Sequence, residues 1–265
     1  LSIHLKTAKE RDYDGKTAID LIVESVEVPR NVTEEILYNL MIDSLFLNVK
    51  TGEEINEVKR DFDTLLQAAD TNERKANVYR MYSMIDEENK KPRGALSNAK
   101  KAKALDPNSW LSIKRLGDYY FSRNEFDKAI ATYLETESVA AGIKNDELRR
   151  HYLRRCYTCV AFSYINADKG KKAAKYFEKV LMLYTDEKES YLVLKYLQQL
   201  YFDQRQWVLL KPVAEKINAL FPNHYAHAYM ALGSYYYEEE KDIENALNFY
   251  KKAAQVNCMS DTFIG

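Results

Sequence analysis

Two cysteines stand in the one short motif of this chain that could carry redox or metal chemistry. Cys156-Tyr157-Thr158-Cys159 has the C-x-x-C spacing, which a redox protein places at a strand-to-helix junction and a zinc site completes with a second pair of ligands. Neither context is present, and Cys258 is distant in sequence. We therefore expect two small, half-buried residues within a helix.

Two histidines provide the next candidate for chemistry. His224 and His227 are separated by about one helical turn, which is the spacing of half a metal site. No carboxylate or cysteine is evidently paired with them, and Asn223 has the character of a helix cap. The sequence also lacks a glycine-rich phosphate loop, a Gly-x-Ser-x-Gly elbow and a His-Glu-x-x-His motif. We predict no catalytic residue, metal or cofactor, and no enzyme activity.

Composition limits the classes of partner. The 265 residues are 46% apolar, and 39 Lys and Arg against 40 Asp and Glu give a formal charge of -1, which argues against a general nucleic-acid binder. No run of about 18 apolar residues predicts a membrane span. The chain begins at Leu1 without Met or an apolar signal segment, which fits a trimmed cytoplasmic chain and a mature exported protein equally. The compartment is therefore open.

Internal repetition identifies the elements that must position any functional residue. Residues 116–120 and 232–236 share a Leu-Gly-x-x-Tyr core, and an Ala-x-x-x-Tyr step follows at Ala129 and at Ala246. The equivalent small or short residues of successive units are separated by 34, 44, 37 and 35 residues; they are Ser83, Gly117, Ala161, Gln198 and Gly233. A period in this range predicts stacked helical hairpins, and 21 Tyr against 8 Gly suit closely packed helices.

This pattern resembles the tetratricopeptide repeat (TPR) family, whose signature combines an aromatic residue, Leu-Gly, Tyr, Ala and a closing Pro. The resemblance implies an all-α, right-handed superhelical solenoid of helix-turn-helix repeats. We divide the chain into degenerate TPR-like hairpins at 1–75, four better-matched repeats at 76–256 and a C-terminal tail at 257–265. The resemblance covers about three quarters of the chain well.

The clearest repeat extends from Trp110 to Ala140. Its apolar residues recur at i, i+3, i+4 and i+7 in two segments joined by a turn at 123–125, which predicts two amphipathic helices. Small residues at Gly117 and Ala129 would let these helices approach closely. The longer step to the next repeat places about ten extra residues near 141–147, where we expect a longer helix or a loop.

In the TPR family the first helix of each repeat lines the concave surface, and this implies a groove in the present chain. The positions that map to the groove are Lys114, Asp118, Phe121, Arg155, Phe162, Ile165, Lys195, Gln199, Phe202, His227, Met230, Ser234 and Tyr237. Cations alternate there with aromatic and aliphatic side chains, which suits a peptide that carries an acidic group. The alternative is that the aromatic rings form core between repeats while the cations only solvate a helix face.

Some TPR proteins hold the C-terminal carboxylate of chaperones with a clamp of Lys, Asn and Arg residues. Lys114 stands at the first clamp position, but Asp118 replaces the expected Asn and Cys159 lies near a later basic position. An anionic Asp118 would repel the carboxylate. We therefore do not expect this specialised role.

The resulting functional prediction is a non-enzymatic scaffold or adaptor that holds a peptide or partner helix in the concave groove. The alternative is a structural or sensor array that acts through self-association at its ends or convex face. Partners are expected to be proteins or peptides, with an acidic group as one option, and neither nucleic acid nor a membrane. The last recognisable helix ends near Val256, so either the tail folds back over it or an apolar face stays open. We predict weak homo-oligomerisation or a partner at this end.

Overall fold

The computed structural model describes residues 62–67, 69–186, 188, 190–222 and 225–261, with side chains described to Val256. Nearly all of the region predicted to hold degenerate hairpins, 1–75, lies outside these ranges, as do His224 and the end of the tail. The described chain forms two compact units, Leu1–Pro107 and Asn108–Gly265.

The described part of the first unit contains one complete hairpin, formed by α4 (Asn72–Glu88) and α5 (Pro92–Leu105). Thr71 caps α4 by accepting a hydrogen bond from the Arg74 amide at 3.1 Å. Pro92 is the first residue of α5, where the missing amide has no helical partner to lose. The two helices join where the Ser83 hydroxyl, fully buried on α4, donates to the Ala95 carbonyl at 2.7 Å.

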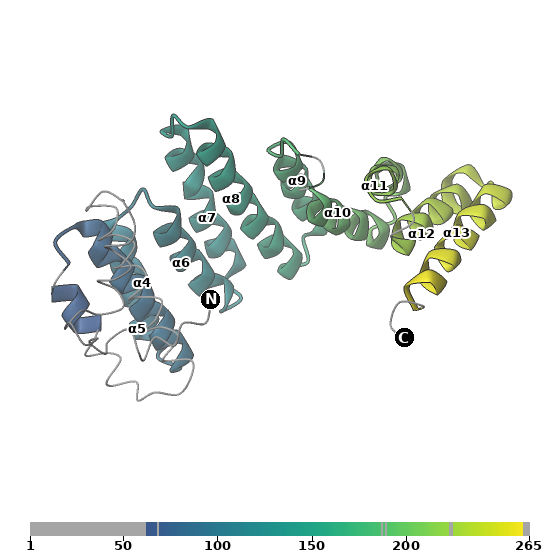
Figure 1. The fold of residues 1–265 in the computed structure, drawn as a ribbon. Coiled ribbons are helices and arrows are strands. Elements are labelled where there is room, and N and C mark those ends of the chain that lie inside the picture. Colours follow the sequence, from purple (N-terminus) through teal and green to yellow (C-terminus); the bar gives the residue numbers. More distant parts are fainter. Residues whose placement is uncertain (1–61, 68, 187, 189, 223–224, 262–265) are drawn as a thin grey trace, which may run out of the picture. The chain divides into compact units, whose positions relative to one another are not determined.

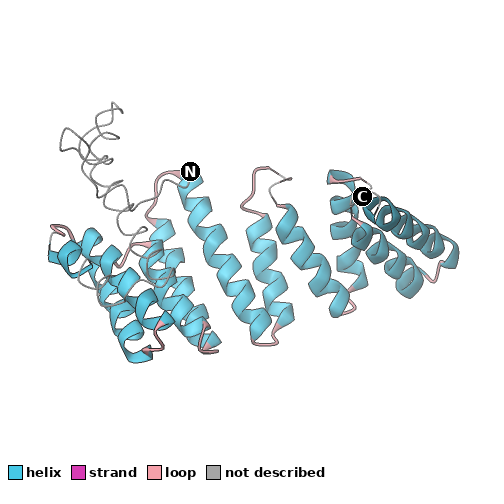
Figure 2. Ribbon diagram, turned by 60° about the horizontal axis from the view of Figure 1, so that its bottom comes forward, coloured by secondary structure: helices cyan, strands magenta, loops and turns pink. Residues whose placement is uncertain are grey.

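The second unit consists of four further hairpins, shown in Figure 1 and, by secondary structure, in Figure 2. Their helices are α6 (Trp110–Phe121), α7 (Phe126–Ala141), α8 (Asp146–Asn166), α9 (Gly170–Leu181), α10 (Tyr191–Asp203), α11 (Trp207–Leu220), α12 (Ala226–Tyr235) with the π-helix η1 (Tyr236–Glu240), and α13 (Ile243–Asp261). Every described element is helical, which confirms the all-α prediction. The described chain thus has five hairpins from α4 to α13, one more than the four repeats counted over 76–256.

Each hairpin turn uses one residue in the left-handed region. These residues are Lys90, Asn124, Asp168, Arg205 and Lys241, with φ between 52° and 59°. In the first four turns the next amide donates to the carbonyl five residues earlier, as from Gln206 to Tyr201 at 2.8 Å. This geometry terminates the first helix and reverses the chain. The turns therefore repeat the same backbone conformation, although none of the five residues is glycine.

The last turn carries one extra residue, as the sequence indicates. The structure accommodates it by widening the end of the first helix into η1, so that Asp242 donates to the Tyr236 carbonyl six residues earlier at 2.9 Å. A π-helical turn is the usual form that one inserted residue takes in a helix. Ile243 can then begin α13 in the same register as the second helices of the other hairpins.

The extra residues between the second and third hairpins lengthen a helix. A short connection of 142–145 follows α7, and α8 is 21 residues long, compared with 12 for α6. The Asn145 side chain caps α8 by accepting from the Leu148 amide at 2.9 Å. Of the two predicted forms, longer helix or loop, the structure therefore has the longer helix.

Some first helices of successive hairpins contact one another, whereas the second helices of the described chain do not. Within the second unit, α6 contacts α8 and α10 contacts α12, although α8 and α10 make no comparable contact; no pair of successive second helices among α7, α9, α11 and α13 makes one in the described chain. A row of hairpins curves toward the side on which its helices approach most closely. The first helices therefore form the inner layer, where the predicted groove residues lie.

Candidate functional site

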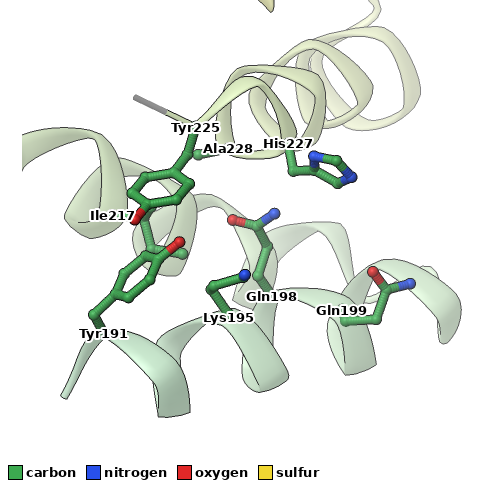
Figure 3. Close-up of a pocket in the computed structure, with 8 residues that line it drawn as sticks. All are labelled: Tyr191, Lys195, Gln198, Gln199, Ile217, Tyr225, His227 and Ala228. Carbon is green, nitrogen blue, oxygen red and sulfur yellow. The ribbon is translucent and has the colours of Figure 1, made fainter. Parts of the chain in front are cut away.

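A pocket of about 130 Å³ lies between α10, α11 and α12, in the second unit (Figure 3). Its lining residues are Tyr191, Lys195, Gln198, Gln199, Ile217, Tyr225, His227 and Ala228. Lys195, Gln199 and His227 belong to the predicted groove. The structure thus brings together predicted residues from two successive first helices.

Aromatic rings form one wall of this pocket. The ring centroids of Tyr191, at the start of α10, and Tyr225, just before α12, are 4.5 Å apart, and Phe221 at the end of α11 lies 4.8 and 5.6 Å from them. Burial, together with the neighbouring Tyr225 hydroxyl, raises the pKa of Tyr191 above its usual range. Tyr191 therefore stays neutral at physiological pH. The wall is therefore aromatic and uncharged, with the tyrosine hydroxyls as its polar atoms.

Lys195 supplies the charge of the pocket. It lies one turn after Tyr191, and its Nζ stands 5.6 Å from the Tyr191 centroid and 6.0 Å from that of Tyr225. The rings attract the ammonium through their negative faces. The side chain is exposed, and within the described chain no carboxylate lies within ion-pair distance of it. Its positive charge is therefore available to a ligand.

Two further polar groups face the pocket. The Oε1 atom of Gln198 is buried and accepts no hydrogen bond from the described residues. His227 is exposed on the first turn of α12, and Figure 3 shows the Gln198 amide between its imidazole and Lys195. Gln199, in contrast, donates to Asp203 at 2.7 Å. The pocket combines an exposed cation with a buried, unpaired carbonyl oxygen, so it can pair with a carboxylate at Lys195.

The first groove position is already neutralised within the protein. Lys114 and Asp118 form an ion pair at 2.5 Å, one helical turn apart on α6. Asp118 also accepts a hydrogen bond from the Tyr133 hydroxyl at 2.7 Å. Both side chains are about one-third exposed. Unlike Lys195, Lys114 therefore presents no uncompensated charge.

The predicted phenylalanines pack against second helices. The ring centroids of Phe121 and Phe126 are 5.7 Å apart, and those of Phe202 and Trp207 are 5.5 Å apart, both edge to face. Phe162 makes the same contact with Phe177 at 5.6 Å and also meets Tyr196 of α10 at 5.0 Å. These rings serve the packing of the hairpins, while Phe202 keeps 36% of its surface exposed.

The remaining predicted groove residues lie outside the pocket. Arg155 is exposed on α8, and no described carboxylate lies within ion-pair distance of it. Tyr237 is 52% exposed on η1. The pocket therefore collects neither these two nor Lys114, Asp118, Phe121, Phe162 or Phe202.

The sequence analysis did not predict the other five lining residues, which are Tyr191, Gln198, Ile217, Tyr225 and Ala228. Tyr191 and Tyr225 come before the first-helix positions that line the groove in the TPR family. Ile217 belongs to a second helix. The available signal was the cluster of aromatic residues around Pro222, namely Phe221 and Tyr225, next to a helix start.

The two cysteines of the C-x-x-C motif lie on α8, where Cys156 is buried and Cys159 is partly buried. Cys156 is fully buried and donates to the Tyr133 carbonyl at 3.0 Å. Burial and the Glu137 carboxylate raise the pKa of Cys156 to about 12, and burial and Asp118 raise that of Cys159 to about 11. Thiols with such pKa values stay protonated at neutral pH, and a thiolate is the form that attacks or binds metal. Among the described residues no three side chains are grouped to hold a metal ion.

Membrane insertion has no candidate among the described helices, since none is both long and apolar enough to cross a bilayer.

Comparison with known proteins identifies the fold. No family model and no curated protein matches the sequence. Among solved structures, PilF of Pseudomonas aeruginosa aligns over 81% of this chain and 89% of its own, with a TM-score of 0.54 and 15% identity. YrrB, a TPR protein described as having an unusual peptide-binding site, aligns over 74% and 91% at a TM-score of 0.52 and 15% identity. MamA aligns over 71% and 94% at 0.53 and 18%.

Proposed function

We propose that this chain, which has the fold of the tetratricopeptide repeat proteins, is a non-enzymatic protein-interaction scaffold that holds a segment of a partner along its first helices. The pocket between α10, α11 and α12 is the anchor point. The observation that carries this proposal is the unpaired ammonium of Lys195, held over two tyrosine rings beside Gln198 and His227.

The size and lining of the pocket favour a peptide over a metabolite. Its volume of about 130 Å³ is well below the roughly 300–1,000 Å³ typical of small-molecule sites. It can hold one side chain or a chain terminus, while the rest of an extended segment follows the inner layer of helices. The aromatic wall would contact the apolar part of that segment, and Lys195 would pair with a carboxylate at its end or on a side chain.

Lys195 and Arg155 are the cations that this proposal requires, because they carry exposed charges with no carboxylate of the described chain in ion-pair range. Lys114 is excluded as an anchor by its ion pair with Asp118. Reversing the charge of Lys195 should therefore weaken capture of every such ligand, and reversing that of Arg155 should weaken it only for ligands long enough to reach α8.

The test is selection of a random peptide display library on the immobilised full chain, followed by affinity measurement on the selected peptides. We expect enriched peptides to share an acidic group next to an apolar residue, and Lys195→Glu to weaken their binding by roughly tenfold or more, since a charged hydrogen bond is replaced by repulsion. Lys175→Glu on α9, which is also exposed and outside the pocket, is the matched control.

Circular dichroism establishes that both variants fold. Peptides that bind Lys195→Glu and Lys175→Glu as tightly as the wild type would contradict the pocket as the anchor. An absence of any enriched peptide would contradict peptide capture altogether.

The alternative function is a structural array that acts through its ends. The apolar side chains that α13 leaves exposed favour this as a second activity.

A further inference from the structure

The last helix presents an apolar stripe to solvent. Ile243, Leu247 and Tyr250 on α13 are 62%, 52% and 37% exposed, and Ala254 is exposed one turn further on. The intervals of four, three and four residues place these side chains in one line along the helix. Ala246 and Ala253, which are buried against α12, lie beside this line, roughly a fifth of a turn away around the helix.

Equivalent positions in the preceding hairpins are covered. Leu247 and Tyr250 correspond to Ile130 and Tyr133 of α7, which are 6% and 2% exposed. Ile130 and Tyr133 pack in one cluster with Cys156 and Val160 of α8, the first helix of the following hairpin. The stripe on α13 therefore occupies the position at which a second helix packs against the first helix of the following hairpin. No described helix covers it.

Charges beside the stripe indicate which helix fits there. Glu244 and Lys251 lie two turns apart along the same edge of the stripe, both are exposed, and neither is within ion-pair distance of an opposite charge in the described chain. If a second copy of α13 is laid antiparallel, Glu244 of each helix faces Lys251 of the other. A parallel arrangement would instead bring the two Glu244 residues to the same height.

The apolar residues complement one another in the same antiparallel register. Leu247 meets Tyr250 of the second copy, and Ile243 meets Ala254, so that large side chains face smaller ones along the line. Two-fold symmetry produces each contact twice.

We propose that α13 docks in antiparallel orientation on α13 of a second copy of this chain, which forms a weak two-fold dimer. The proposal is independent of peptide capture, since it uses no residue of the pocket. One helix from each copy makes a small contact, so association is expected only at high protein concentration.

Sedimentation equilibrium of the full chain over roughly 10–500 µM tests the proposal, since a small contact corresponds to a dissociation constant in this range. The wild type should pass from monomer to dimer. Leu247→Glu should weaken dimerisation by roughly tenfold or more, because a buried apolar side chain is replaced by a charge in both copies. Asn248→Glu, which adds the same charge one residue away on the exposed surface, should leave most of the dimer intact.

A charge exchange tests the antiparallel register. Glu244→Lys and Lys251→Glu alone should each weaken the dimer, because each creates two like-charge pairs across the two-fold axis. The double variant should restore it, since the pairs re-form with opposite sign. A chain that stays monomeric over the whole range would overturn the proposal, as would single and double variants that dimerise alike. A monomer would mean that α13 does not dock on a second copy of itself.

Discussion

At the scale of single residues, the close approach of paired helices depends on a glycine that faces a tyrosine. A Cβ atom on Gly117 would lie 2.3 Å from the Tyr133 ring, and one on Gly233 would lie 2.6 Å from the Tyr250 ring. The Tyr133 ring cannot swing away freely, because its hydroxyl donates to Asp118 at 2.7 Å and the ring is 2% exposed. The glycine of the repeated Leu-Gly pair is therefore needed because a larger residue would collide with the tyrosine ring of the paired helix.

We predict that Gly117→Ala lowers the free energy of unfolding by about 1–3 kcal/mol, because overpacking at the Tyr133 ring outweighs the better helix propensity of alanine. Gly142→Ala is the control, since its Cβ would meet nothing nearer than the Val139 carbonyl oxygen at 3.5 Å. Urea unfolding followed by circular dichroism measures both. Equal stability of the two variants would refute the steric account.

The sequence predicts this glycine well but the pocket only in part. Small residues at fixed repeat positions are visible without a structure, and so are Lys195, Gln199 and His227 as residues of first helices. The ion pair of Lys114 and Asp118 has a recognisable i,i+4 spacing, yet spacing alone does not reveal that Asp118 also binds Tyr133. The aromatic cluster around Pro222 signals Tyr225, but its pairing with Tyr191 could not be predicted, because that pairing depends on how α11 returns the chain between them.

At the scale of elements, the five hairpin turns share one left-handed backbone position, although the residue type at that position varies. Left-handed backbone costs an L-residue roughly 1–2 kcal/mol, and asparagine tolerates it better than lysine or arginine. Of the five turn positions only Asn124 and Asp168 are residues of this tolerant kind. The packing of each hairpin therefore imposes the turn geometry on Lys90, Arg205 and Lys241, and the sequence at these positions does not indicate it.

Arg205→Gly is accordingly expected to raise the free energy of unfolding by about 0.5–1 kcal/mol, because glycine adopts φ near 52° without steric cost. Arg205→Ala is the matched control: it removes the same side chain but keeps the Cβ atom that disfavours this geometry, so it should bring no gain. Thermal and urea unfolding of the two variants compare the effects. A stabilisation by alanine equal to that by glycine would assign the effect to the side chain instead.

Helix boundaries were predictable to the extent that proline marks them. Pro92 begins α5 and Pro107 follows its end, as their restricted geometry requires. The η1 widening was not predictable, since an extra residue in a turn can equally form a loop. The extension of α8 was one of two open alternatives, and Asn145, which caps it, was the residue that could have decided between them.

At the scale of the whole molecule, buried hydroxyls and thiols join helices within and between hairpins and make stability depend on pH at the alkaline end. Tyr201 of α10 donates to Glu178 of α9 at 2.5 Å, and Tyr133 of α7 donates to Asp118 of α6. Burial, together with these carboxylates, raises the pKa of both tyrosines above their usual range, and burial raises that of Cys156 to about 12. The folded chain therefore keeps protons that the unfolded chain releases.

The sign of the pH dependence follows from this difference. Below about pH 7.5 these groups are protonated in both states, and stability does not depend on them; above the unfolded pKa values, about 8.5 for Cys and about 10 for Tyr, the unfolded chain ionises first. We expect the free energy of unfolding to be level near pH 7 and then to fall, by about 1.4 kcal/mol per pH unit for each group whose unfolded pKa has been passed. Urea unfolding at pH 7 to 11 measures the fall, and Tyr201→Phe, which cannot ionise, should make it less steep. A curve for this variant as steep as that of the wild type would show that Tyr201 is not held neutral by the fold.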